Sequence, residues 1–213
     1  MSKLTVQNAT KEEVTVFLTF GVSGPVCPTP ASVDDFPILS SIPGNPLQGK
    51  FSLAAGATQE FDPKGKCFTG NVGFFIAPQC PIAGADFHLG KEGTNIGEFT
   101  LNVTKGEEAF DISCVNGVNC WMKMSVTGTG WSYGSNNTPI NSIENKALQH
   151  NQGNPGVYPV NCTDCIRLLG ASPCPSLPIG PAQTERICNI ERPVQSGSDD
   201  TLTVTLQEGR PPS

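Results

Sequence analysis

Residues 97–126 carry the pattern that most constrains the fold, because apolar and polar side chains alternate there with a period of two. The apolar positions of the first two segments are Phe99, Leu101, Val103, Phe110, Ile112 and Cys114. This period is typical of β-strands with one buried face. Asn116-Gly117 is a turn signal, since both residues tolerate a positive φ. The segment predicts three strands with two short connections, and we expect all three in one sheet.

The composition favours an all-β protein. Of 213 residues, 23 are Gly and 19 are Pro, only 15% are charged, and no long helical pattern is found. The net charge of −6 and the lack of a basic run argue against a nucleic-acid partner. No apolar run approaches the roughly 20 residues of a transmembrane helix, so no membrane contact is expected.

Further alternating segments predict the rest of a sandwich. Residues 2–22 predict a hairpin that turns near 8–13, and residues 67–76 and 200–207 predict single strands. Residues 23–50 are rich in Pro, Gly and Ser and predict a loop, with Cys27 as a possible anchor.

Nine cysteines are unusual for a cytosolic β-domain of this size. Four of them lie among prolines and predict a small lobe held by disulfides: Cys162, Cys165, Cys174 and Cys188. Zinc or redox use of Cys162-x-x-Cys165 is the alternative, but the spacing fits no common zinc motif. We expect the sandwich over 1–126 and 197–213, the lobe over 127–196, and at least three disulfides, most of them in the second half.

The order of strand, glutamate, aspartate and Asn-Gly loop resembles the thaumatin-like (pathogenesis-related) family. The family's E-F-T-L strand, D-I/V-S strand, V-D-G-F/Y-N loop and M-S-V segment match 98–101, 111–113, 115–119 and 122–126. Residues 51–62 are similar to the family's L-x-P-G turn and strand, with Ala55 replacing the proline. The resemblance implies a divergent small member, with a β-sandwich beside a Cys/Pro-rich loop lobe.

The resemblance also implies an acidic cleft, where some family members bind or slowly hydrolyse β-1,3-glucan. Glu98 and Asp111 occupy two of its acidic positions and are the candidate catalytic residues. Asn116 replaces the third acidic residue, and the stretch 76–79 lacks the family's arginine. Asp86 and His88 are further candidate ligand-binding residues, although a lone loop histidine is more often a surface residue.

The spacing of the two carboxyl groups decides between binding and hydrolysis. If 97–104 pairs with 109–115 across 105–108, Glu98 faces Val115, and Asp111 lies four positions along the ladder, about 13 Å away. That separation is too long for either glycosidase mechanism. The residue beside Glu98 is then Asn116, whose amide cannot act as a base.

These observations predict a carbohydrate-binding or defence-type protein without efficient catalysis, whose partner is a polysaccharide or oligosaccharide. The alternatives are a weak endo-β-1,3-glucanase, another activity in the same cleft, and a structural or interaction protein that lost the site. We expect a monomer with no cofactor and no metal.

The localisation expected from the cysteines is extracellular, and four N-x-S/T sequons fit this expectation: Asn8, Asn102, Asn136 and Asn161. The N-terminus has no apolar signal-peptide core. Either a signal peptide was removed, or the protein is cytoplasmic.

Overall fold

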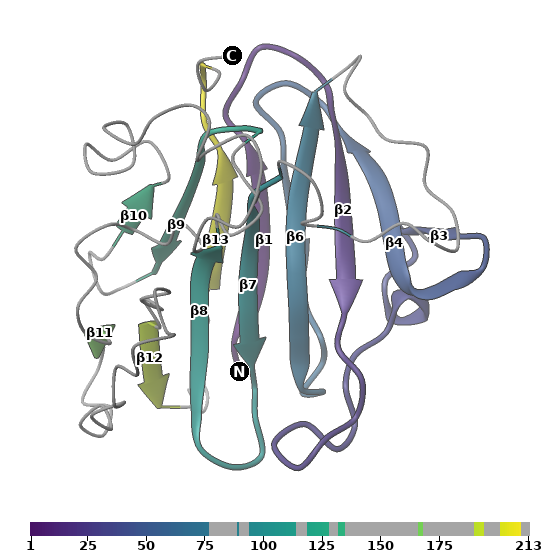
Figure 1. The fold of residues 1–213 in the computed structure, drawn as a ribbon, viewed down its shortest axis with the longest axis vertical. Coiled ribbons are helices and arrows are strands. Elements are labelled where there is room, and N and C mark those ends of the chain that lie inside the picture. The colour runs from purple at the N-terminus through teal and green to yellow at the C-terminus, as the bar shows by residue number, and fades with distance from the viewer. Residues whose placement is uncertain are drawn as a thin grey trace, which may run out of the picture.

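The computed structural model describes residues 1–76, 89, 94–113, 119–127, 132–134, 166–167, 190–193 and 201–209. Within these ranges the chain is all β, with thirteen strands in two sheets and one short 3-10 helix, η1 (Val33–Asp35). Figure 1 shows the larger sheet in front of the smaller one. The expected all-β class is therefore confirmed.

The sheets have five and eight strands, and almost all neighbouring strands are antiparallel. The five-stranded sheet has the order β10 (Ser132–Gly134), β9 (Met122–Val126), β13 (Thr201–Leu206), β1 (Lys3–Asn8) and β5 (Thr58–Phe61). The eight-stranded sheet has the order β11 (Ile166–Arg167), β12 (Ile190–Pro193), β8 (Glu107–Ser113), β7 (Ile96–Leu101), β6 (Phe68–Ile76), β2 (Val14–Phe20), β4 (Asn45–Leu53) and β3 (Ser40–Ile42).

The two sheets face each other across one apolar core. Leu4 and Val204 of the smaller sheet and Val16 of the larger sheet belong to the same buried cluster. At Gly97, a Cβ would come within 2.8 Å of Met124 Cε in the opposite sheet, so the absent side chain allows the sheets to approach closely there. Longer strands such as β1 and β7 bury one face because their side chains alternate, which is the pattern that the sequence showed.

The expected N-terminal hairpin is wrong. β1 pairs with β13 and β5 in the smaller sheet, while β2 pairs with β4 and β6 in the larger one. Asn8 holds the intervening turn, because its Nδ2 donates to the carbonyl oxygens of Glu12 (2.7 Å), Leu53 (3.1 Å) and Ala54 (3.0 Å). The alternation is the same for a hairpin and for two strands on opposite sides of a core.

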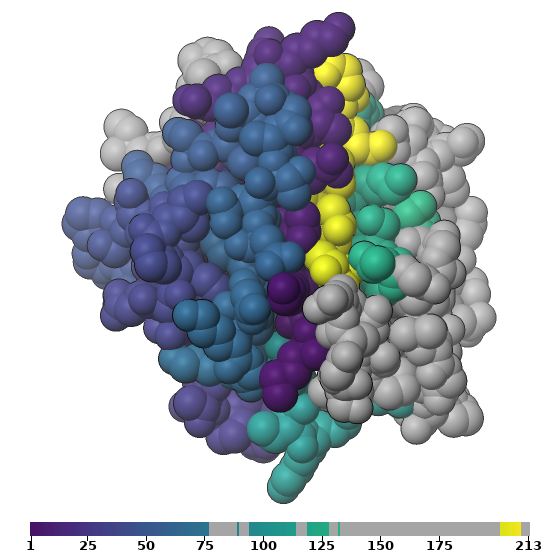
Figure 2. Space-filling view, turned by 180° about the vertical axis from the view of Figure 1, so that it is seen from behind, coloured from purple at the N-terminus to yellow at the C-terminus, as the bar shows by residue number. Residues whose placement is uncertain are grey.

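The strands of 97–126 also divide between the sheets, contrary to the expectation of one sheet. β7 and β8 form a hairpin in the larger sheet, and β9 pairs with β13 and β10 in the smaller sheet. Figure 2 shows the back of the molecule, where β1 and β13 lie side by side as its central parallel pair. The last strand thus returns to the sandwich as expected.

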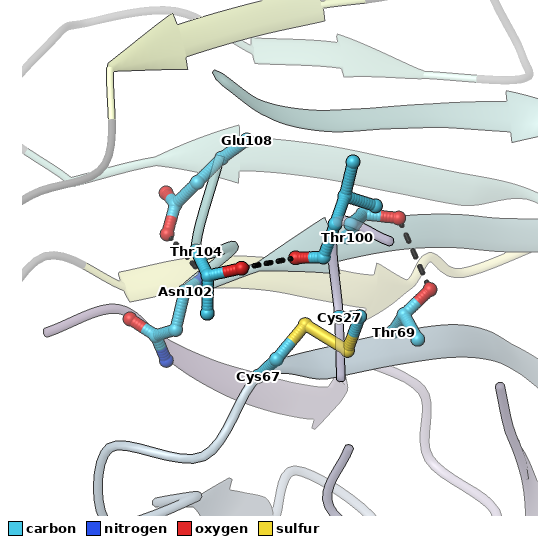
Figure 3. The surroundings of a disulfide bond; sticks show 8 residues. Cys27, Cys67, Thr69, Thr100, Asn102, Thr104 and Glu108 are labelled. Carbon is cyan, nitrogen blue, oxygen red and sulfur yellow. Dashed lines mark hydrogen bonds between the residues drawn. A yellow bond between two sulfur atoms is a disulfide. The ribbon is translucent and has the colours of Figure 1, made fainter. Parts of the chain in front are cut away.

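Residues 23–50 are not only loop, because they contain η1, β3 and most of β4. Pro46 is accommodated where β4 has only the short β3 on its outer side. Cys27 anchors this region through a disulfide to Cys67, 40 residues away. Figure 3 shows the disulfide beside Thr69, Thr100 and the tip of the β7–β8 hairpin.

The range expected to form the Cys/Pro-rich lobe contributes short strands to both sheets. β10 extends the smaller sheet beside β9, and β12 extends the larger sheet beside β8. Its cysteines lie outside the described residues, so the expected disulfides there stay predictions. No helix in the described part of the chain has the length and apolar character needed to cross a membrane.

Candidate functional site

Glu98 of β7 and Asp111 of β8 are directly opposite each other in the sheet. Their side chains share the outer face, because Phe99 and Phe110, their neighbours along the strands, point into the core. The register expected from the sequence, with Asp111 four positions from Glu98's partner, is therefore wrong. Directly opposed residues have Cβ atoms about 4.5–5.5 Å apart.

The hairpin loop explains the difference in register. The strands end at Leu101 and resume at Glu107, so the loop is shifted relative to the expected 105–108. Asn102 has φ 53° and Gly106 has φ 85°, and these two residues turn the chain earlier in the sequence than the expected loop over 105–108. The Glu108 carboxylate accepts a hydrogen bond from the Asn102 backbone N–H at 2.7 Å. Asn102 is a polar residue in a strand-like pattern, and it ends the strand.

The carboxyl pair continues a row of polar side chains across five strands. Each member is in register with the next, and together they form what we call the polar row: Gln48 of β4, Thr19 of β2, Asn71 of β6, Glu98 of β7 and Asp111 of β8. At one end Gln48 Nε2 donates to Thr19 Oγ1 at 3.0 Å, and Asn45 Nδ2 donates to Gln48 Oε1 at 2.9 Å. That end of the row is satisfied internally.

The carboxyl end of the row is buried. Asp111 is only 7% exposed. Burial raises the pKa of Asp111 to about 8, and the charge of the adjacent Glu98 contributes to this rise. Burial also raises the pKa of Glu98, against the opposing effect of a hydrogen bond from the Ser113 side chain. Asp111 is thus the group that keeps a proton at neutral pH, and the pair presents a donor next to an acceptor.

Asn71 lies beside Glu98 on the other side from Asp111. Its Oδ1 is buried and has no hydrogen-bond partner. Gly70 positions this strand, because a Cβ at Gly70 would lie 1.9 Å from the carbonyl oxygen of Thr19. Sequence reasoning missed Asn71, although its polar place in the strand pattern of residues 67–76 was the available signal.

An apolar cluster adjoins the polar row on the same face. Phe17 and Phe75 contact each other edge to face, with centroids 5.2 Å apart. Leu89 packs on them and lies over Gly73, where a Cβ would meet Leu89 Cδ1 at 2.6 Å. The two rings are buried, so they support this face and offer no exposed stacking surface.

A second polar cluster holds the chain just after the hairpin. Asn95 Nδ2 donates to the Cys120 carbonyl oxygen (3.1 Å), Cys120 Sγ donates to Asn95 Oδ1 (3.5 Å), and Asn119 Nδ2 donates to the Phe74 carbonyl oxygen (2.8 Å). These contacts fix residues 119–120 against β6 and the start of β7.

Three further residues were predicted to belong to the site. Asn116, Asp86 and His88 lie outside the described residues, so their roles stay predictions. Trp121 precedes β9, and it packs on the main core and near Gly209.

No group of three or more His, Cys, Asp or Glu side chains suited to a metal ion occurs among the described residues. Comparison with known proteins found no family model that matches the chain. It also found no curated protein that matches the chain significantly. The site is therefore interpreted from its own chemistry.

Proposed function

We propose that this chain is a divergent thaumatin-like protein that binds a β-glucan-type polysaccharide or oligosaccharide through Glu98 and Asp111. The observation that carries the proposal is the direct pairing of the two carboxyl groups on the outer face of the eight-stranded sheet. Vicinal sugar hydroxyls both donate and accept hydrogen bonds, so they complement a protonated carboxyl beside an ionised one. The motifs of residues 98–126 support the family assignment.

The proposal includes an extracellular, defence-type role. The disulfide between Cys27 and Cys67 supports it, because such bonds persist in oxidising compartments. The finer architecture, with a cysteine-rich lobe beside an acidic cleft, is part of the same proposal.

Binding can be tested by titrating the protein with β-1,3-glucan oligomers. We expect Glu98→Gln to weaken binding by about 1–2 kcal/mol, the scale of one charge-assisted hydrogen bond. Thr100→Val is the matched control, because Thr100 shares that face of β7 but bonds Thr69 instead. No binding by the unmodified protein, or equal weakening by both variants, would contradict the proposal.

Hydrolysis is the second candidate function, and the register favours it. The two carboxyls are cross-strand neighbours, near the roughly 5–5.5 Å separation used by retaining glycosidases. Their different protonation is also what an acid and a nucleophile need. The argument against catalysis based on Asn116 no longer applies, since Asp111 is itself the neighbour of Glu98.

Turnover of a long β-1,3-glucan separates the two candidates. Release of reducing ends over many turnovers, abolished by Glu98→Gln and by Asp111→Asn but not by Thr100→Val, would establish an enzyme. Binding without release of reducing ends would leave the protein as a lectin-like binder.

A further inference from the structure

The connection between β6 and β7 is much longer than the fold requires. The two strands are antiparallel neighbours in the larger sheet, and residues 77–95 join them. A hairpin between such strands needs only about 2–5 residues. Connections that exceed this length by so much commonly carry functional groups on a rigid scaffold. The place where this connection contacts the sheet therefore bears on function.

Leu89 is a point at which the connection contacts the outer face of the larger sheet. It packs on Phe17 and Phe75, whose rings are buried although they lie on that face. Beneath it is Gly73, where a Cβ would lie 2.6 Å from Leu89 Cδ1. We call this socket, formed by Gly73 and the two rings, the Leu89 seat. It has room for a leucine only because residue 73 carries no side chain.

The Leu89 seat adjoins the carboxyl pair. Gly73 and Asn71 share the outer face of β6 because they are two residues apart, and Asn71 is directly opposite Glu98. Gly73 is therefore the diagonal neighbour of Glu98 across the two strands, at about 7–8 Å. An apolar side chain over Gly73 excludes water from one flank of Glu98, in agreement with the burial that raises the pKa of this carboxyl group.

The chain is held again where the connection rejoins β7. Asn95 Nδ2 donates to the Cys120 carbonyl oxygen at 3.1 Å, and the Asn95 backbone N–H donates to Asn119 Oδ1 at 3.2 Å. Asn119 Nδ2 in turn donates to the carbonyl oxygen of Phe74, the residue after Gly73. Both ends of the connection are thus tied to β6, so the contact of Leu89 constrains where its middle runs.

We propose that Leu89 is a positioning residue of the carbohydrate site: seated over Gly73, it holds the β6–β7 connection against the outer face beside Glu98. This inference rests on the proposed carbohydrate-binding function and adds the residue that orders one side of its site. The leucine side chain has no hydrogen-bonding group, so it acts through the chain it holds and the water it excludes. Binding beside Glu98 then costs less conformational entropy, because the neighbouring chain is already held.

The experiment titrates β-1,3-glucan oligomers into the unmodified protein and four single variants by calorimetry. Leu89→Ala empties the seat and Gly73→Ala fills it from below, so each should weaken binding about tenfold. Leu89→Met keeps an adaptable apolar side chain of similar volume and should retain the affinity within about twofold. Leu47→Ala is the matched control, because Leu47 is also a partly exposed leucine but lies on the other face of its strand from the polar row.

Amide hydrogen exchange of the protein without ligand tests the seat independently of binding. In Leu89→Ala and Gly73→Ala, peptides from residues 77–95 should exchange at least about fivefold faster, because the chain has lost its contact with the sheet. Peptides from β1 and β13 in the opposite sheet should keep their protection. Leu89→Met should exchange like the unmodified protein.

The outcomes separate this inference from the proposed function. Equal affinity of the unmodified protein and Leu89→Ala, or unchanged exchange of residues 77–95, would overturn the positioning role and leave carbohydrate binding intact. Faster exchange in β1 and β13 as well would assign the effect to the stability of the whole fold and would also overturn it. If no oligomer binds the unmodified protein, the proposed function fails and the role of Leu89 in binding fails with it.

Discussion

Burial of Asp111 disfavours the charged form of its carboxyl group. Its pKa is about 8 in the folded protein, against an ordinary value of 3.8. Between these values the folded state holds a proton that the unfolded state releases, so the free energy of unfolding falls as the pH rises from about 4 to about 8. Asp111→Asn removes this titration. The difference in the free energy of unfolding between Asp111→Asn and the unmodified protein should therefore shift in favour of the variant by up to about 4 kcal/mol from pH 5 to pH 8.

Chemical denaturation at pH 5, 6, 7 and 8 measures this difference. Asp35 is the matched control, because its pKa is lowered and Asp35→Asn leaves the titration of Asp111 in place. Parallel pH profiles for the unmodified protein and Asp111→Asn would show that Asp111 titrates normally in the folded state.

The sequence predicted the identity of the paired residues better than their geometry. The family motifs pointed to Glu98 and Asp111, which the structure brings together. Their spacing was wrong because the register depends on where the loop turns, and Asn102 and Gly106 turn it through positive φ values that no alternation pattern contains. Asn71 was missed because a single polar residue on a strand carries no signal about its neighbours across the sheet.

The β7–β8 hairpin is held by a buried network at its tip. Asn102 Oδ1 accepts from the Ser2 backbone N–H, and Asn102 Nδ2 donates to the Ser2 carbonyl oxygen, both at 2.8 Å. The Glu108 carboxylate also accepts from the Ser2 hydroxyl at 2.8 Å. Asn102→Ala removes the two side-chain bonds, and alanine tolerates the positive φ of this position less well than asparagine does. We expect a loss of about 2–4 kcal/mol in the free energy of unfolding.

Asn102→Gly is the informative comparison for this prediction. It loses the same two hydrogen bonds but adopts φ 53° without strain, so it should be about 1 kcal/mol more stable than Asn102→Ala. Urea denaturation of both variants measures the difference. An alanine variant as stable as the glycine variant would show that backbone conformation contributes nothing at this turn.

Two glycines on neighbouring strands differ in what their missing side chain would meet. A Cβ at Gly70 would lie 1.9 Å from the Thr19 backbone oxygen, whereas one at Gly97 would lie 2.8 Å from the flexible end of Met124. Backbone cannot move aside without breaking the β2–β6 ladder, but a methionine terminus can. We expect Gly70→Ala to cost about 3 kcal/mol or more and Gly97→Ala about 1 kcal/mol. Thermal denaturation of both variants tests this order, and a reversed order would contradict it.

Disulfide Cys27–Cys67 connects two segments that lie 40 residues apart in the sequence. The bridge closes a loop of 40 residues and contacts Val103 at the hairpin tip, near the hydrogen bond from the Thr104 backbone N–H to the Val26 carbonyl oxygen. By the loop-closure estimate, replacing both cysteines with alanine should lower the free energy of unfolding by about 4 kcal/mol.

Denaturation of the double variant, next to the unmodified protein with and without reductant, measures this contribution. Reductant should lower the free energy of unfolding of the unmodified protein by a similar amount. It should have little effect on the part of the double variant that normally contains this bridge. A variant as stable as the oxidised protein would mean that the bridge adds nothing beyond the packing of its small, buried side chains.

The existence of the strands was predictable from the sequence, but their distribution between the sheets was not. β1, β2, β6, β7, β8 and β13 all show the expected alternation. Both sheets bury their inner faces in the same core, so the pattern of Leu4 and Val6 is indistinguishable from that of Val14 and Val16. Long-range pairing, such as the parallel contact of β1 with β13, leaves no local trace.

The burial of Asn8 and Asn102 bears on how the protein can be made. Both begin N-x-S/T sequons, yet in the native structure each side-chain nitrogen is committed to carbonyl oxygens inside the protein. An oligosaccharyltransferase meets the chain before it folds, and a glycan added at either asparagine has no room in the finished sandwich. In a eukaryotic secretory pathway, modification at these two positions and folding are therefore competing fates, and only chains that escape the enzyme at both positions mature.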